Sequence, residues 1–257
     1  MEAWIQFGQG PLFRFCFVIM LLGLLRIFIL TVIGMVEALN RNPDKIVPYK
    51  ELIKQTIAWL FPIKRLWTKR PIYGAVSFLF HIGLILVPLF YATHVLLWKN
   101  SVGFAWPSIP KSMADNLTLI VILAGITLFL MRVFYRPGRA LSRKQDYVWP
   151  LLLVIPFITG YVCANAAVSP TFYQLMMLIH VLSADLIMVM IPFTKIAHCM
   201  LLPLSQLVTG ISWKFPPGAG DRVIETLGYE DRPTWVEKPR LSRPLESVVK
   251  EEEVPAQ

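Results

Sequence analysis

Five long runs of apolar residues constrain the fold of this chain more than any other feature. They cover approximately residues 12–36, 72–98, 117–133, 148–168 and 172–208. A helix needs about 20 apolar residues to cross a hydrocarbon core of about 30 Å, and backbone groups cannot stay unpaired in lipid. No alternating pattern supports a strand barrel. The sequence therefore predicts an all-α integral membrane protein, a bundle of five helices.

Composition agrees with this prediction and excludes other classes. Only 16% of the 257 residues are charged, against about 25% in an ordinary soluble domain. The net charge is +9, but the basic residues lie between the apolar runs without interleaved aromatics, which argues against nucleic-acid binding. Cys16, Cys163 and Cys199 are widely separated and form no C-x-x-C pair. A disulfide, or an iron–sulfur cluster held by this chain, is therefore not favoured.

The distribution of basic residues predicts the orientation of the chain. Eight Lys or Arg residues lie in 37–70, five in 132–147 and seven from 210 onward, whereas the alternate connections hold two at most. Because basic loops stay in the cytoplasm, the N-terminus is predicted outside and the C-terminus in the cytoplasm. Residues 1–11 contain no Lys or Arg, so the first run is predicted to be a mature helix and not a signal peptide.

Two domains are predicted, a membrane domain over residues 1–210 and a cytoplasmic tail over 211–257. Within the first, residues 49–67 mix apolar and basic residues in a pattern typical of a helix in the membrane interface. The tail is rich in proline and charge and cannot bury a core of its own. Because it carries Trp213, Tyr229 and Trp235, it is predicted to order on a cytoplasmic partner, and a solvated end is the alternative.

Only four histidines occur, and all of them lie in apolar runs. His81 and His94 are in the second run, and His180 and His198 are in the fifth. A lone histidine in a membrane helix is most often a packing residue, but polar groups in lipid are functional candidates and neutral imidazole is the commonest metal ligand. Two pairs on two helices favour a cofactor held between facing helices of the bundle.

The predicted orientation makes these two helices antiparallel. It places His81 opposite His198 near the cytoplasmic side and His94 opposite His180 towards the outside. At about 1.5 Å per residue the spacing is about 20 Å on one helix and about 27 Å on the other, where it spans close to five whole turns. The arrangement predicts two bis-histidine haems. Zinc is not favoured, because no Cys or Glu completes a tetrahedral set.

A mismatch of about 7 Å between the two helices remains on ideal geometry. Pro88 and Pro192 each lie between the members of a histidine pair. A proline can change the axis and the phase of a helix, so kinks at these positions are expected to close the gap.

These features resemble a known family. They are the histidines on the second and fifth of five helices, the predicted outside N-terminus, and the run Ile-Pro-Phe-Thr-Lys-Ile-Ala-His ending at His198. The resemblance is to the cytochrome b subunit of membrane-bound nitrate reductase, the gamma chain, and to its relatives in the sulfite-reduction-associated membrane complex and in membrane-bound heterodisulfide reductase. It covers residues 12 to about 208. The long first loop, the long tail and the wide spacing of His81 and His94 favour the last two relatives, with the nitrate reductase subunit as the alternative.

The resemblance implies a quinone-reactive subunit of a respiratory oxidoreductase in the inner membrane of a prokaryote. Such a subunit carries two b haems, here the outer one on His94 and His180 and the inner one on His81 and His198. It exchanges electrons between the quinone pool and a cytoplasmic iron–sulfur subunit, while the terminal chemistry occurs on another polypeptide. Further membrane or periplasmic cytochrome subunits are also among the partners it implies.

Other polar residues near the predicted haems are candidates for supporting roles. Haem propionates are anions that bind basic side chains. The candidates at the cytoplasmic edge are Lys195, Arg132, Arg136 and Arg139, with ordinary membrane anchoring as the alternative. Arg26 lies within the first run, where an unpaired charge is costly. It is expected to pair with Asp185 or to approach a propionate.

The family places its quinol site beside the outer haem. A quinone needs an apolar slot with a hydrogen-bonding group. Lys99 or Lys111, in the second connection, would bond the quinone carbonyl, unless both are simply solvated. Two other functional classes stay open. They are a transporter whose histidines relay protons and a haem-free anchor for a cytoplasmic enzyme.

Overall fold

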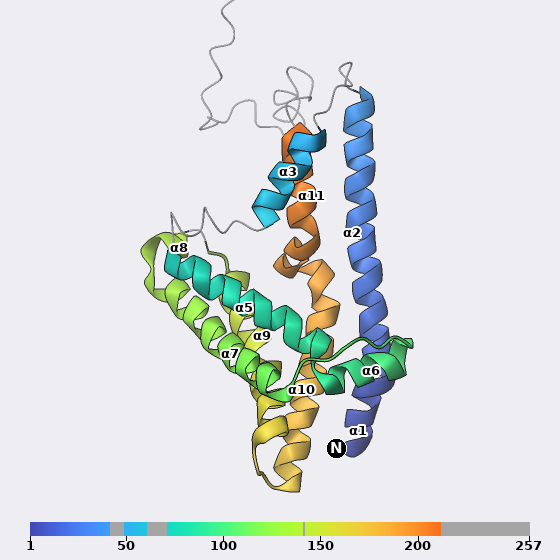
Figure 1. Ribbon diagram of the computed structural model, residues 1–257, viewed down its shortest axis with the longest axis vertical. Coiled ribbons are helices and arrows are strands. Elements are labelled where there is room, and N and C mark those ends of the chain that lie inside the picture. Colours follow the sequence, from blue (N-terminus) through green and yellow to red (C-terminus); the bar gives the residue numbers. More distant parts are fainter. Residues whose placement is uncertain (42–48, 61–70, 141, 212–257) are drawn as a thin grey trace, which may run out of the picture.

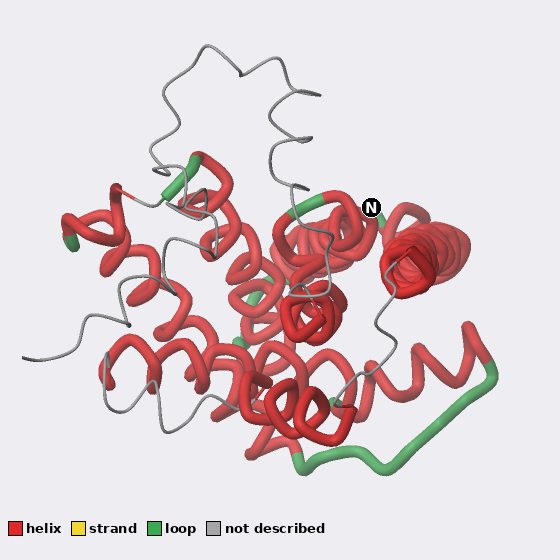
Figure 2. The backbone as a smooth tube through the Cα atoms, turned by 90° about the horizontal axis from the view of Figure 1, so that it is seen from above, coloured by secondary structure: helices red, strands yellow, loops and turns green. Residues whose placement is uncertain are grey.

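The computed structural model describes residues 1–41, 49–60, 71–140 and 142–211, and it contains no strand within these ranges. Figure 2 shows the helices joined by loops. In chain order the elements are α1 (Glu2–Phe7), the π-helix η1 (Gly8–Leu12), α2 (Phe13–Arg41), α3 (Tyr49–Leu60), α5 (Pro71–Phe90), α6 (Ala92–Val102), α7 (Lys111–Phe134), α8 (Arg136–Ala140), α9 (Lys144–Asn165), α10 (Pro170–Met190), the 3-10 turns η2 (Ile191–Phe193) and η3 (Lys195–Ala197), and α11 (His198–Ile211).

Five helical stretches are long and apolar enough to cross a membrane, as the sequence predicts. They are Glu2–Asn40, Pro71–Phe90, Lys111–Phe134, Lys144–Asn165 and Pro170–Phe193. Their outer faces carry large exposed apolar side chains, such as Phe15 and Leu123, which are 62% and 66% exposed. Such faces need lipid to cover them. The chain is therefore a helical, multi-pass membrane protein.

Helices α5, α7, α9 and α10 pack side by side in chain order, and α10 then packs against α2 (Figure 1). Small residues let the backbones approach closely. A Cβ added at Gly83 of α5 would lie 2.4 Å from Val121 of α7, and one at Gly125 would lie 2.4 Å from Val154 of α9. Close approach at small residues is the usual way in which membrane helices associate, since lipid removes the hydrophobic drive between them.

The second predicted helix does not run unbroken to residue 98. It ends at Phe90, and α6 begins at Ala92 after Tyr91 adopts extended backbone angles. The carbonyl of Phe90 accepts a hydrogen bond from the N–H of Ile109, which replaces the helical bond that would continue α5. As a result α6 turns towards the start of α2 (Figure 1), where the Trp98 ring lies edge-on to Phe13 and Phe17.

The fifth predicted helix is also interrupted, and the break falls at Pro192, one of the two positions where a kink is expected. Helix α10 ends at Met190, and two short turns lead to α11. Thr194 between the turns is extended, with φ −130° and ψ −177°. Pro192 is buried and lies against α2, where a Cβ built on Gly23 would be 2.5 Å from the Pro192 Cβ. A proline cannot donate the helical hydrogen bond, so the break falls here.

The predicted interfacial helix begins at Tyr49 as expected and is described as far as Leu60, while residues 61–67 lie outside the described ranges. Leu52 and Thr56 are buried on its packed side. That side meets α11, beside which α3 lies in Figure 1. The predicted tail also lies outside the described residues, except for Ile211 at the end of α11.

Candidate cofactor-binding site

The breaks in the two helices bring the four histidines into two facing pairs. His94 of α6 faces His180 of α10, with ring centroids 5.9 Å apart and planes 12° apart. His81 of α5 faces His198 at the start of α11, with centroids 6.0 Å apart and planes at 80°. These are the two pairings that the antiparallel order predicts. The pairings form because α6 and α11 are separate helices. They do not require two continuous helices whose histidines are equally spaced.

Each histidine ring is held by a backbone carbonyl at Nδ1. The accepting oxygens are those of Ser77 for His81 (2.6 Å), Val87 for His94 (3.2 Å), Pro156 for His180 (2.8 Å) and Lys195 for His198 (2.7 Å). A carbonyl oxygen only accepts, so in each neutral ring Nδ1 carries the proton and Nε2 keeps its lone pair. A carbonyl on the other ring nitrogen is the arrangement that orients histidine ligands of metals.

The separation within each pair fits one metal atom bound between two imidazoles. Histidine nitrogens bind metals at about 2 Å. Adding the distance from each nitrogen to its ring centre, about 1 Å, puts two rings on opposite sides of one metal at about 6 Å between centroids. The observed 5.9 and 6.0 Å agree with this value. The centroid separation in each pair is therefore compatible with one metal atom between the two rings.

The surroundings of the His94–His180 pair keep His94 neutral and leave room for the His180 ring. α6 lies outside the five candidate spans, and there burial, with His180 beside it, lowers the pKa of His94 to about 4. The ring is therefore uncharged at neutral pH, which is the form that binds a metal. On the other side Gly160 leaves space for His180, since a Cβ at that position would lie 2.8 Å from Cε1 of the ring.

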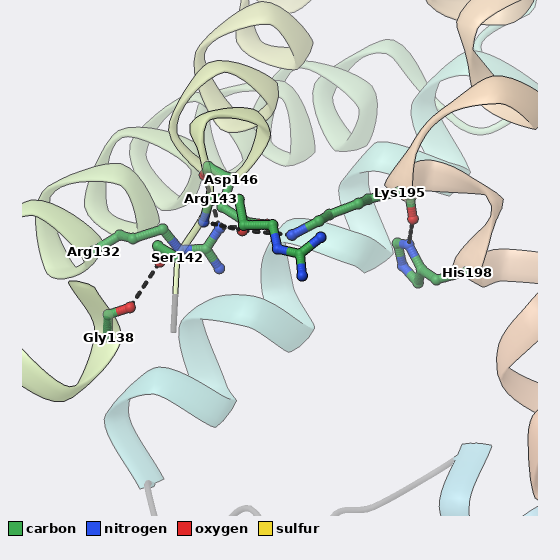
Figure 3. A network of polar contacts seen from close by, with 7 residues as sticks. All are labelled: Arg132, Gly138, Ser142, Arg143, Asp146, Lys195 and His198. Carbon is green, nitrogen blue, oxygen red and sulfur yellow. Dashed lines mark hydrogen bonds and ion pairs between the residues drawn. The ribbon is translucent and has the colours of Figure 1, made fainter. Parts of the chain in front are cut away.

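Lys195 links His198 to an ionic cluster at the start of α9 (Figure 3). Asp146 lies 2.5 Å from Nζ of Lys195 and 3.5 Å from Arg132. Two of the predicted propionate-binding residues are thus already paired with a carboxylate. The other two, Arg136 and Arg139, are exposed on α8. His198 itself is exposed, in contrast to the partly buried His81.

Sequence reasoning missed Asp146. One signal was available, since Asp146 stands three residues after Arg143 at the beginning of a helix, where it closes a capping box. That position predicts a cap, but not the two long-range partners.

The residues expected to contact a quinone occupy different surroundings. Lys99 is exposed near the end of α6, five residues after His94. Lys111 at the start of α7 bonds Asp115 at 2.6 Å and also Asn165 at the end of α9. Asn165 in turn donates to Asp115 at 3.1 Å. The structure therefore holds Lys111 in a polar cluster that joins α7 to α9 and leaves Lys99 in the open.

The expected pairing of Arg26 with Asp185 is not formed. Asp185 is 3% exposed, and its Oδ2 has no hydrogen-bond partner among the described residues. It lies beside Gly8, where an added Cβ would be 3.8 Å from Oδ2. Because Gly23 of α2 is already level with Pro192, Arg26 lies beyond the end of α10, where its side chain is exposed. The two side chains lie at different levels because the first helix starts at Glu2, ten residues before its apolar run.

The described structure thus defines a class, a multi-pass helical membrane protein with two facing pairs of histidines. In sequence the chain is similar to a curated protein of Nitratidesulfovibrio vulgaris (strain Hildenborough) whose name states no function. The two are 28% identical over 220 residues, which is 84% of this chain and 96% of the relative. No family model matches the chain, and no solved structure matches it.

Proposed function

We propose that this protein is a di-haem cytochrome b, a membrane subunit that carries electrons between a quinone and a cytoplasmic iron–sulfur partner. The observation that carries the proposal is that two pairs of imidazoles face each other at about 6 Å while every Nδ1 is held by a carbonyl. Histidines that served only to pack the helices would not need to face each other in pairs, and their Nε2 atoms would not need to stay available for a ligand. Haem, when bound, would accept and release one electron at each of the two levels.

The chain's own residues supply positioning and electrostatics, which is the usual share of the protein in cofactor chemistry. His94 and His180 would hold one haem, and His81 and His198 the other. The carbonyls at Nδ1 fix the tautomer and raise the basicity of each ring. Of the five residues expected to meet a propionate, Lys195 and Arg132 bind Asp146, which leaves Arg26, Arg136 and Arg139 for that role.

The basic loops support an orientation with the N-terminus outside and the His81–His198 pair towards the cytoplasm. In that orientation the α8 corner, which carries Arg136 and Arg139, faces the cytoplasm. The quinone would bind towards the outside, near the His94–His180 pair. There Lys99 is the better hydrogen-bond donor of the two expected lysines, because Lys111 is engaged by Asp115 and Asn165.

The partner complex is proposed from the resemblance. It is a respiratory oxidoreductase of the sulfite-reduction or heterodisulfide-reductase kind, in the inner membrane of a prokaryote, with nitrate reductase as the alternative. The terminal chemistry takes place on another subunit. Additional membrane or periplasmic cytochromes belong to the same proposal.

A spectrum tests the proposal directly. The purified chain is expected to show a b-type α-band in the reduced-minus-oxidised absorption spectrum and two haems per chain. His94→Ala and His81→Ala should each reduce the haem content from two to one, while Gly34→Ala serves as a control because nothing lies within 4 Å of its new Cβ. Absence of the α-band, or a haem content well below two, would favour a proton-relaying transporter or a haem-free anchor.

A further inference from the structure

We propose that Asp146 is a positioning residue for His198, and that it acts through Lys195. The inference rests on the proposed function, because its effect appears at the haem held by His81 and His198. Asp146 anchors the turn between α10 and α11, and this turn supplies the carbonyl that orients the His198 ring.

The Asp146 carboxylate gathers three donors from separate parts of the chain (Figure 3). Oδ2 accepts the backbone N–H of Arg143 at 2.8 Å and lies 2.5 Å from Nζ of Lys195. Oδ1 lies 3.5 Å from Arg132, which also donates to the Asp146 carbonyl at 2.7 Å. The side chain is only 16% exposed, so solvent screens these interactions less than at an open surface. The end of α7, the start of α9 and the η3 turn are thus joined at one carboxylate.

Lys195 connects this carboxylate to the histidine. Its side chain binds Asp146, and its carbonyl accepts the hydrogen bond from Nδ1 of His198 at 2.7 Å. No regular helix holds that carbonyl, since Lys195 begins a three-residue turn after the extended Thr194. Apolar contacts hold the turn through Pro192 against Gly23, through Ile196 on the core and through the buried Ala197, and the ion pair of Lys195 with Asp146 ties it to the start of α9.

Among the residues that the structure describes, the His94–His180 pair has no comparable ionic anchor. The Nδ1 atoms of these two rings bond carbonyls within α5 and α9, which are long regular helices. Loss of the Asp146 carboxylate should therefore disturb one histidine pair and leave the other unchanged. A cap that merely stabilises α9 would not discriminate between the two.

The test compares variants of the full chain by electron paramagnetic resonance and by haem content. Asp146→Asn keeps an oxygen for the Arg143 N–H but removes the charge that binds Lys195, and Lys195→Met removes the same ion pair from its other side. Asp146→Glu keeps the carboxylate. Asp115→Asn is the matched control, because Asp115 forms a lysine–carboxylate pair of similar length, 2.6 Å, in the polar cluster at Lys111 and Asn165.

Asp146→Asn and Lys195→Met should both shift or remove the low-spin signal that His198→Ala removes, with the haem content falling from two towards one. The other signal should stay unchanged in both, and both signals should stay in Asp146→Glu and Asp115→Asn.

An Asp146→Asn protein with two unchanged signals would overturn the inference. If only Lys195→Met shifted the signal, Lys195 would act on the haem directly and not through Asp146. Loss of both haems in Asp146→Asn would show that Asp146 is only a structural cap of α9, and it would also overturn the inference. A wild-type chain without haem would instead refute the proposed function, which separates the two failures.

Discussion

Gly160→Ala places a methyl group against the His180 ring and tests the site at a residue that is not a ligand. The new Cβ would lie 2.8 Å from Cε1 and 2.9 Å from Nδ1 of His180. Ordinary van der Waals contact begins at 3.4 Å, so the ring must move by about 0.6 Å. It cannot move freely, because Nδ1 is bonded to the Pro156 carbonyl at 2.8 Å on the same helix as Gly160.

The expected cost follows from these two contacts. Inserting a methyl group into a packed site costs about 1–3 kcal/mol. Losing one hydrogen bond costs about 0.5–1.5 kcal/mol more. At about 1.4 kcal/mol for each factor of ten, haem bound by His94 and His180 should be held roughly 10- to 1,000-fold more weakly. The His81–His198 haem should be unaffected.

The assay is the haem content per chain together with the spectrum, measured after washing at a series of protein dilutions. Gly34→Ala and Gly10→Ala are matched controls, because nothing lies within 4 Å of a Cβ at either position. Gly160→Ala with two tightly bound haems and an unchanged spectrum would refute the placement of His180 as a ligand. Equal loss of both haems would show that the substitution disrupts the fold and not the ring.

Two further predictions test the geometry, and a third tests the proposed orientation. The His94–His180 planes are nearly parallel and the His81–His198 planes nearly perpendicular, so the two haems should give two distinct low-spin resonance signals, and one shared signal would contradict these ring orientations. Gly125→Leu should destabilise the packing of α7 on α9, as seen in the thermal midpoint in detergent, because even a Cβ there lies 2.4 Å from Val154; a midpoint equal to that of Gly34→Leu would contradict this. A reporter fused after residue 211 should be active only in the cytoplasm, and activity outside would reverse the orientation.

The number of spans and the two histidine pairings could be predicted because both depend on local or one-dimensional properties. A run of apolar residues long enough to cross lipid is visible in the sequence alone, and the order of antiparallel helices then sets which histidine meets which. Pro192 marks one of the two breaks in the sequence, but the position of the other, at the end of α5, could not be predicted in the same way. The end of α5 depends on the Ile109 N–H reaching the Phe90 carbonyl, a contact between residues 19 positions apart.

The supporting residues were harder still. For Arg26 and Lys195, the choice between an ion pair, a propionate contact and membrane anchoring depended on which helix packs beside each residue. The structure leaves Arg26 exposed beyond Asp185 and gives Lys195 to Asp146, 49 residues away in the chain. Charge and residue type identify such candidates, but the partner is chosen by the packing of separate helices.

By itself the sequence determined that lipid must cover this chain, that it forms five long apolar helices, and that its four histidines lie in two of the apolar runs. Tertiary structure alone decided that α6 and α11 are helices separate from α5 and α10, that each ring faces its partner at about 6 Å, and that a carbonyl holds the Nδ1 of each histidine. The physical reason is that the free energy of placing a helix in lipid is a sum over the residues of one local run. The geometry of a ligand pair depends instead on hydrogen bonds and close contacts made by distant parts of the chain.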